Sequence, residues 1–220
     1  MRRPALEHGS EIYELMVEVE SSTELNGPTH PQTVTAAKSL AIAFWQAGEI
    51  EQAIDLLDRV LGRLGLSPPE QAMRADLLST LAEIFFHQGH LDLAGDVQRE
   101  VLELRLRELG PEDEKSLEAK GDLATVLFAL GQDSEAVILE QEAYDAARFH
   151  LDKTHPVRCI LAWNRARSQE RRGDLEASIA ILVNELVWLL GKEPSQLGGV
   201  ENAIRILVSK RLGWDRPAVC

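Results

Sequence analysis

Apolar side chains recur along the chain at the spacing of an α-helix. Leu40 and Phe44 are four residues apart, and Ile54 and Leu57 follow at an interval of three. Side chains three or four residues apart lie on one face of a helix, so each run predicts an amphipathic helix. Gly48 separates the two runs, and a glycine at a helix end readily takes the positive φ of a tight turn. The pattern therefore predicts two antiparallel helices joined by a short turn.

This unit is repeated four times at an interval of about 42 residues. The glycines that end the first helices are 41, 42 and 42 residues apart, and a small residue follows each one five positions later. The glycines are Gly48, Gly89, Gly131 and Gly173, and the small residues are Ala53, Ala94, Ala136 and Ser178. Small side chains let two helices pack closely, and a fixed period of this length is the signature of a repeat protein. The sequence predicts an all-α fold, an α-solenoid of stacked antiparallel helix pairs.

We expect the whole chain, residues 1–220, to form a single solenoid. The helix-pair repeats are expected at residues 30–65, 68–109, 112–152 and 155–190. An orphan helix at residues 10–24 and a capping helix at residues 195–213 are expected at the two ends, because a solenoid needs a cap where stacking stops.

The residues of each unit resemble a known family. A Leu-Ala pair such as Leu81–Ala82, followed by the aromatic Phe85 and then by Gly89, is similar to the pattern of tetratricopeptide repeats. The 42-residue period and the Thr-His-Pro loops at residues 29–31 and 154–156 are most similar to the kinesin-light-chain type of that family. The resemblance covers residues 10–212. It implies a right-handed solenoid whose first helices line a concave groove that holds a peptide or a partner protein.

The resemblance also implies which side chains face that groove. They are Lys38, Trp45, Asp76, Glu83, Phe86, His87, Glu118, Thr125, Phe128, Trp163, Asn164, Arg167 and Arg171. Trp45, Phe86 and Phe128 each lie three residues before a repeat glycine, and we call them the aromatic row. Such a row would anchor a helix or an extended peptide. The alternative is that these rings pack between adjacent first helices or under the N-terminal helix.

Charge also varies along this set. Asp76, Glu83 and Glu118 are acidic and lie in the middle, whereas Arg167 and Arg171 lie toward the C-terminal end. A polarised groove would fix the direction of a bound peptide and speed its association. The alternative is a solvated helix face with mixed charge.

Two binding patterns of the family are incomplete in this chain. Kinesin-light-chain-type repeats carry asparagine just before the Leu-Ala pair, and only Asn164 occupies that place here. The clamp of chaperone adaptors pairs a lysine with an asparagine one turn later, but Lys38 is followed there by Ile42. Neither a kinesin-type cargo motif nor a chaperone C-terminal tail can therefore be inferred as the ligand, and the sequence does not identify the ligand.

Composition narrows the function further. The chain has 36 acidic and 23 basic side chains, a formal net charge of −13, which argues against nucleic-acid binding. No apolar run approaches the roughly 20 residues that span a bilayer, so no membrane is expected. Two cysteines form no disulfide framework, and a cytoplasmic protein is expected.

We therefore expect a non-catalytic adaptor, scaffold or regulatory module that binds protein or peptide partners, with no cofactor and no metal. Phosphate-loop, nucleophile-elbow and zinc-helix motifs are absent from the sequence. Two alternatives remain open. The first is a small-molecule or metal-binding sensor, or an atypical enzyme, that uses Asp76, Glu83, His87 and Glu118. The second is a homo-oligomeric structural protein.

Overall fold

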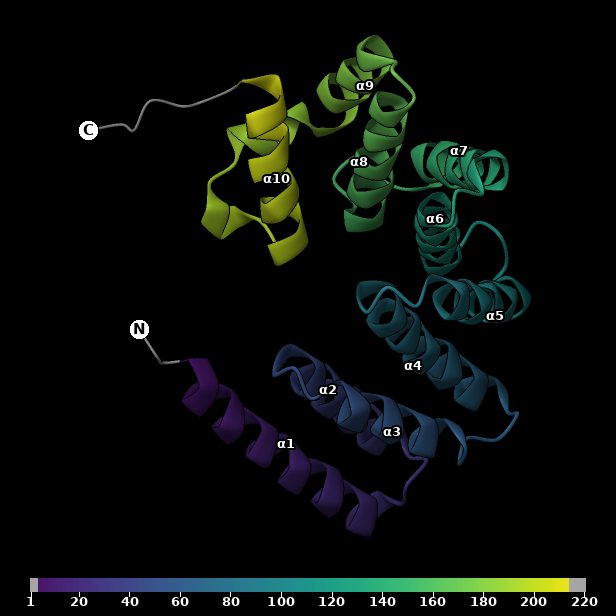
Figure 1. Cartoon of the computed structure of the whole chain (residues 1–220), viewed down its shortest axis with the longest axis vertical. Coiled ribbons are helices and arrows are strands. Elements are labelled where there is room, and N and C mark those ends of the chain that lie inside the picture. The colour runs from purple at the N-terminus through teal and green to yellow at the C-terminus, as the bar shows by residue number, and fades with distance from the viewer. Residues whose placement is uncertain (1–3, 214–220) are drawn as a thin grey trace. The chain divides into compact units, whose positions relative to one another are not determined.

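The computed structural model describes residues 4–213, with side chains from residue 9 onward, and every regular element within that range is helical (Figure 1). The predicted all-α solenoid class is confirmed. The chain divides into two compact units, Met1–Glu108 and Leu109–Cys220. The expectation that residues 1–220 form one continuous solenoid stays a prediction. In the described part of the chain, no helix combines the length and the hydrophobicity needed to cross a bilayer.

The first unit contains five helices. They are α1 (Pro4–Asn26), α2 (Pro31–Gln46), α3 (Ile50–Leu61), α4 (Pro68–His87) and α5 (Leu91–Leu109). Helix α1 packs along α2, where the hydroxyls of Ser22 and Thr33 lie 2.9 Å apart, and α2 pairs in turn with α3. Helix α4 packs against both members of that pair. Helices α2 and α3 therefore contact each other and also α4 of the next pair, as stacking requires.

Local sequence explains where these helices begin and end. Helix α2 starts with Pro31, and the His30 Nδ1 accepts a hydrogen bond from the Gln32 amide at 3.3 Å. Proline suits the first helical position because it lacks the amide hydrogen that would be unpaired there. Gly48 and Gly89 end the turns after α2 and α4 with φ angles of 84° and 79°. The predicted role of the repeat glycines is confirmed at both positions.

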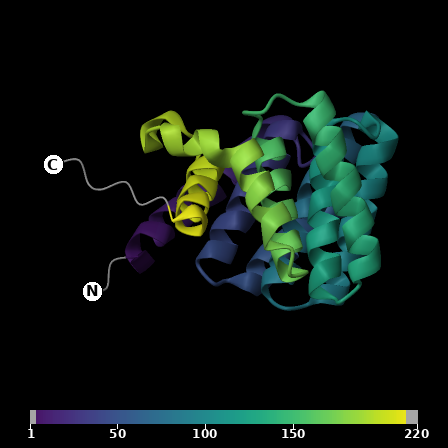
Figure 2. The ribbon, with the colours of Figure 1, turned by 90° about the horizontal axis from the view of Figure 1, so that it is seen from above.

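The second unit contains five α-helices and a stretch of irregular helix. The α-helices are α6 (Glu114–Ala129), α7 (Asp133–His150), α8 (Pro156–Arg171), α9 (Leu175–Ile181) and α10 (Gly199–Leu212). The irregular elements are the π-helix η1 (Leu182–Leu186) and the 3₁₀-helices η2 (Val187–Gly191) and η3 (Pro194–Gln196). Helix α6 pairs with α7, α8 packs against both, and α10 packs on α8 and η2 (Figure 2). This unit holds a pocket between α6, α7 and α8.

The change from α9 to η1 places a charged residue in the interior. A π-helix takes more than four residues per turn, and Leu182, Glu185 and Leu186 are all buried in η1. The Glu185 carboxylate accepts hydrogen bonds from Arg158 at 2.7 Å and pairs with Arg148 at 3.2 Å. The buried charge is thereby compensated by side chains of α8 and α7.

Candidate functional site

The ring of Phe128 and the guanidinium of Arg171 form the centre of the candidate site. Phe128 lies in the last turn of α6 and Arg171 ends α8. The guanidinium carbon lies 4.5 Å from the ring centroid, which is the geometry of a cation–π contact. Arg171 is exposed while Phe128 is half-buried. One side of the guanidinium therefore faces the ring, and its other side is open to solvent.

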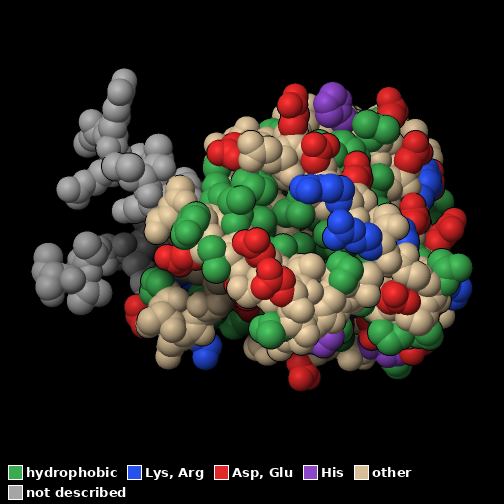
Figure 3. Space-filling model, turned by 90° about the horizontal axis from the view of Figure 1, so that it is seen from below, with side chains coloured by type: hydrophobic (Ala, Val, Ile, Leu, Met, Phe, Trp, Pro, Cys, Tyr) green, Lys and Arg blue, Asp and Glu red, His purple; other side chains and the backbone are tan. Residues whose placement is uncertain are grey.

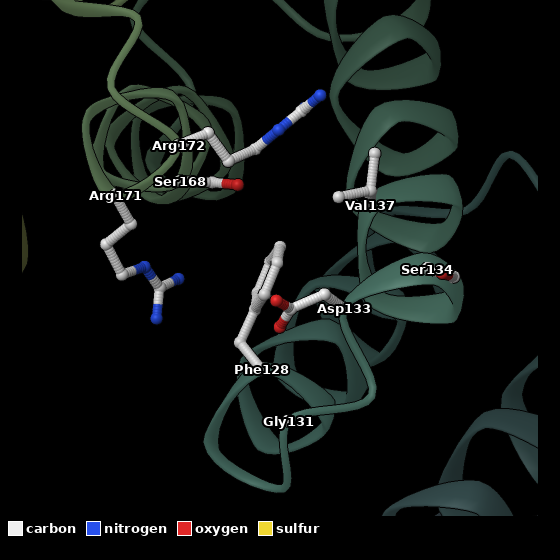
Figure 4. A pocket seen from close by; sticks show the side chains of 8 residues that line it. All are labelled: Phe128, Gly131, Asp133, Ser134, Val137, Ser168, Arg171 and Arg172. Carbon is white, nitrogen blue, oxygen red and sulfur yellow. The ribbon is translucent and has the colours of Figure 1, made fainter.

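An open pocket of about 600 Å³ adjoins this contact. Its lining comes from the end of α6, the first two turns of α7 and the end of α8. The lining residues are Phe128, Gly131, Asp133, Ser134, Val137, Ser168, Arg171 and Arg172 (Figure 4). We call this space the α7–α8 pocket. Its volume lies within the range usual for ligand sites, roughly 300–1,000 Å³.

The α7–α8 pocket is positively charged on balance. Arg171 and Arg172 bring two guanidinium groups, and Asp133 brings one carboxylate. Within the described side chains, neither arginine makes an ion pair with an acidic residue. Acidic side chains are scattered over the face drawn in Figure 3, and the chain as a whole has a net charge of −13, so the positive balance of this pocket is unlike that of the rest of the chain.

The N-terminus of α7 adds to this positive character. Its N-cap residue, Gln132, makes no side-chain capping hydrogen bond. At the equivalent turn one repeat later, the Asp174 carboxylate accepts a hydrogen bond from the Ala177 amide at 2.9 Å and caps α9. The partial positive charge of a helix N-terminus favours anions close to its first turn.

The back of the α7–α8 pocket is formed by buried polar groups. Ser168 is only 1% exposed, and its hydroxyl makes no hydrogen bond of normal geometry, although it lies close enough to Glu140 to help lower the pKa of that carboxyl. Arg165 donates a hydrogen bond to Glu140 at 2.9 Å. Burial has the larger effect and raises the pKa of Glu140 above its usual value. A buried ion pair therefore lies directly behind the pocket.

A related contact occurs in the first unit. Trp45 and His87 have ring centroids 5.3 Å apart, and Phe86 meets His87 edge-on at 5.7 Å. Trp45 and Phe128 both lie three residues before a repeat glycine, while His87 and Arg171 both lie two residues before the next one. In each unit, a ring of the aromatic row is therefore in contact with the same position of the following repeat.

The acidic residues of the predicted groove differ in their surroundings. Asp76 is bonded to Arg105 of α5, which is buried, whereas Glu83 and Glu118 are exposed. Arg105 could not be recognised from the sequence, because the pairing joins two helices across 29 residues of sequence. Among the described side chains, no three His, Cys, Asp or Glu residues are placed to hold a metal ion.

The remaining predicted residues are spread over the two units. The first unit holds Lys38, which is half-buried, and it also holds Trp45, Asp76, Glu83, Phe86 and His87. In the second unit, Thr125 donates a hydrogen bond to the Gly121 carbonyl at 3.0 Å, and Trp163 packs against the core that includes α10. Asn164 is half-buried and Arg167 is exposed. Of the predicted set, the structure brings Phe128 together with Arg171 and Trp45 together with His87.

Several pocket residues were not predicted. Asp133 and Val137 belong to the second helix of a pair, and the family resemblance directed attention only to first helices. Ser168 occupies a buried position that sequence cannot distinguish from ordinary core. Arg172 is different, because the doublet Arg171–Arg172 directly before Gly173 occurs in no other repeat and was a usable signal.

Comparison with known proteins agrees with the geometry of the helix pairs. Residues 73–148 match the Tetratricopeptide repeat family. This segment of the chain carries tetratricopeptide repeats. The predicted resemblance to kinesin-light-chain-type repeats is confirmed at the level of the fold. No curated protein matches the sequence.

Several solved structures share this tetratricopeptide-repeat fold. BtubC (BKLC) from P. vanneervenii aligns with a TM-score of 0.76 at 16% identity, over 94% of this chain and 84% of that one. A Podosopora anserina protein with nearly identical TPR-like repeats, described as a kinesin light chain, aligns with a TM-score of 0.63 at 21% identity. The alignment covers 84% of this chain and 89% of that one. The quorum sensor NprR from B. thuringiensis, in its apo form, aligns with a TM-score of 0.69 at 16% identity, over 92% of this chain and 54% of that one. These identities establish likeness of fold, and the fold supports a protein-interaction module in general.

Proposed function

We propose that the protein is a non-catalytic adaptor or regulatory scaffold of the cytoplasm that holds a segment of a partner protein against the aromatic row and the charged residues beside it. In this proposal, Trp45, Phe86 and Phe128 anchor apolar side chains of the partner. Arg167 and Arg171 fix its direction at one end, and Glu83 and Glu118 contribute the opposite charge.

The Phe128–Arg171 contact beside the α7–α8 pocket carries this proposal. Aromatic and arginine side chains dominate the binding energy of most protein interfaces. Here a ring and a guanidinium already hold each other at 4.5 Å, so the free protein presents both groups in fixed positions. A preformed anchor loses little side-chain entropy when a partner binds.

The test is capture of partners by the immobilised full chain. We expect the variant with alanine at Trp45, Phe86 and Phe128 to lose the proteins that the wild type retains, as identified by mass spectrometry. Phe149→Ala is the matched control, because this ring is on α7, is 85% exposed and lies outside the aromatic row. Circular dichroism must show the same helix content for all three proteins.

The outcome distinguishes specific binding at the aromatic row from nonspecific binding. Proteins that bind wild type and Phe149→Ala but not the triple variant would support the aromatic row as the partner site. Proteins that bind all three forms equally would contradict it. A small molecule or metal retained by the wild type, with no protein partner, would favour the sensor or atypical enzyme that Asp76, Glu83, His87 and Glu118 first suggested.

A second candidate function, self-association, has an observation of its own. Helix α9 and the following turn expose Leu175, Ile179 and Val183, which are spaced four residues apart and lie on one helical face. Helix α10 exposes Ile206 and Leu207. Contiguous exposed apolar side chains often mark an interface. Sedimentation of the full chain over a range of concentrations tests this candidate, and a mass that stays monomeric at the highest concentration would contradict it.

A further inference from the structure

We infer that the α7–α8 pocket is a receptor for a carboxylate, supplied by an aspartate or glutamate side chain of the bound partner, with an apolar neighbour of that residue resting on Phe128 and Val137. The inference rests on the proposed function, because it names the chemistry of one partner residue. It differs from the predicted groove in that one wall of the pocket is a second helix, α7, and Arg172 and Ser168 were not among the predicted residues.

The two arginines supply the binding groups. Their side chains leave α8 from adjacent positions, and Figure 4 shows the Arg171 guanidinium beside the Phe128 ring, whereas the Arg172 side chain runs above the ring and points toward α7. A guanidinium matches a carboxylate with two parallel hydrogen bonds, which are stronger than bonds between neutral groups. Because Arg171 is already held over the ring, it is oriented before the ligand arrives.

The charge count favours a carboxylate over a phosphate. Asp133 contributes one negative charge to the pocket, so a carboxylate ligand brings the total to two negative and two positive charges. A phosphate dianion would leave one excess negative charge and would be repelled by Asp133 about twice as strongly. The ion pair of Glu140 with Arg165 behind the pocket is balanced in itself and does not change this count.

One backbone feature and one side-chain feature also favour a carboxylate ligand. The first turn of α7 has no side-chain cap from Gln132, in contrast to the capped start of α9. The buried Ser168 side chain lines the pocket close to Glu140, and its hydroxyl can turn from Glu140 to an oxygen that enters between the helices (Figure 4).

The doublet of arginines is specific to this repeat. At the equivalent positions, the earlier repeats carry Gln46–Ala47, His87–Gln88 and Ala129–Leu130. The solenoid fold therefore does not require positive charge at this turn. A single carboxylate site at one end of the repeat array would set the register of a bound segment, which a uniform apolar row cannot do.

The probes are three synthetic pentapeptides with blocked ends and the sequences Ala-Leu-X-Leu-Ala, where X is glutamate, glutamine or phosphoserine. Each is titrated into the isotope-labelled full chain, and the NMR signals of the Arg171 and Arg172 side chains and of the first turn of α7 are followed. We expect the glutamate peptide to bind roughly five- to tenfold more tightly than the glutamine peptide, because its hydrogen bonds to the arginines are charge-assisted. We also expect it to bind more tightly than the phosphoserine peptide.

Two double variants test the assignment. Arg171→Gln/Arg172→Gln should bind the glutamate and glutamine peptides equally. Lys192→Gln/Lys210→Gln removes the same charge from exposed positions of the same unit outside the pocket, and it should keep the preference. An unchanged backbone spectrum shows that each variant is folded.

Several outcomes would overturn the receptor. Equal affinity of the wild type for the glutamate and glutamine peptides would do so, as would shifts confined to residues outside the pocket. Tighter binding of the phosphoserine peptide would make this a phosphate site instead. Loss of the glutamate preference in the lysine control would assign it to net charge alone. Partner capture by the aromatic row is measured separately, so its result and this one can fail independently.

Discussion

The guanidinium of Arg171 lies over the ring of Phe128 at 4.5 Å, in the same repeat relationship that brings His87 to Trp45 at 5.3 Å. The last turn of one first helix therefore meets the last turn of the next first helix through an aromatic contact in both units. The chemistry of the contact differs, since one partner is an imidazole and the other a permanent cation. This difference gives the second unit its charged pocket. It also allows the energy of the contact between Phe128 and Arg171 to be measured by mutation.

We predict a favourable coupling between Phe128 and Arg171. A double-mutant cycle with Phe128→Leu and Arg171→Gln should show that the two side chains together stabilise the folded chain by about 0.5–1 kcal/mol more than the sum of their separate effects. Leucine keeps the apolar bulk but removes the ring's negative face. The measurement is the free energy of unfolding in urea for the four proteins. A coupling energy of zero would mean that the observed stacking contributes nothing to stability.

The ion pair behind the pocket gives a second prediction. Arg165→Met should lower the free energy of unfolding by about 3–5 kcal/mol, because it leaves the buried Glu140 carboxylate without its partner. Adding Glu140→Gln to this variant should restore most of the loss, since no buried charge then remains. Urea unfolding near neutral pH measures both. If the double variant were no more stable than the single one, the cost would lie in packing and not in charge.

The same pair predicts a pH dependence of definite sign. Burial raises the pKa of Glu140 above its usual 4.5, so the folded chain binds this proton more tightly than the unfolded chain does. Stability from this group therefore falls as pH rises from 4.5 through the raised pKa. In Arg165→Met, which lacks the main group that lowers this pKa, the fall should be steeper. The deficit relative to wild type should shrink toward pH 4.5, and most of it should disappear at every pH when Glu140→Gln is added.

The repeat architecture could be predicted from sequence because it depends on local signals. Gly131 and Gly173 recur with the period, and the structure gives them φ angles of 74° and 84° at the predicted turns. The aromatic row was found from the same register. These features need only a helical period and a positive φ, and both are encoded within one repeat.

The surroundings of the site residues could not be predicted in the same way. The partner of Asp76 is Arg105, which depends on how two helices pack after folding. The α7–α8 pocket includes Val137 because the second helix turns that side chain toward the end of α8. The apolar residues keep an α-helical spacing through Leu182 in the sequence, so nothing in the pattern marks the change to a π-helix at that residue. Each of these depends on contacts between elements, which a periodic pattern does not determine.

A close approach of α6 and α8 leads to a fourth prediction. Gly121 is buried, and a Cβ at this position would overlap Cδ2 of Leu161, which is itself 1% exposed. Gly121→Ala should therefore lower the free energy of unfolding by about 1–3 kcal/mol, despite the higher helix propensity of alanine. Gly9→Ala in α1 is the matched control, because nothing lies within 4 Å of the added Cβ. Thermal unfolding should show destabilisation of the first variant and none of the second; a stabilised Gly121→Ala would refute the close packing.

The last prediction concerns the reactivity of Cys159. Burial, with a smaller contribution from Glu201, raises the pKa of this thiol to about 11, and its side chain is 1% exposed. The thiolate is the reactive form, so at about pH 8 the native thiol should react with a disulfide reagent at least roughly a hundredfold more slowly than a free cysteine. The measurement uses Cys220→Ser, which leaves a single thiol, in native buffer and in concentrated urea. Rapid labelling in urea and slow labelling in native buffer is the expected pair of results. Labelling of the folded chain at the rate of the unfolded one would show that the core formed by α8, η1 and α10 opens readily, and the pocket next to it would then not be held in a fixed shape.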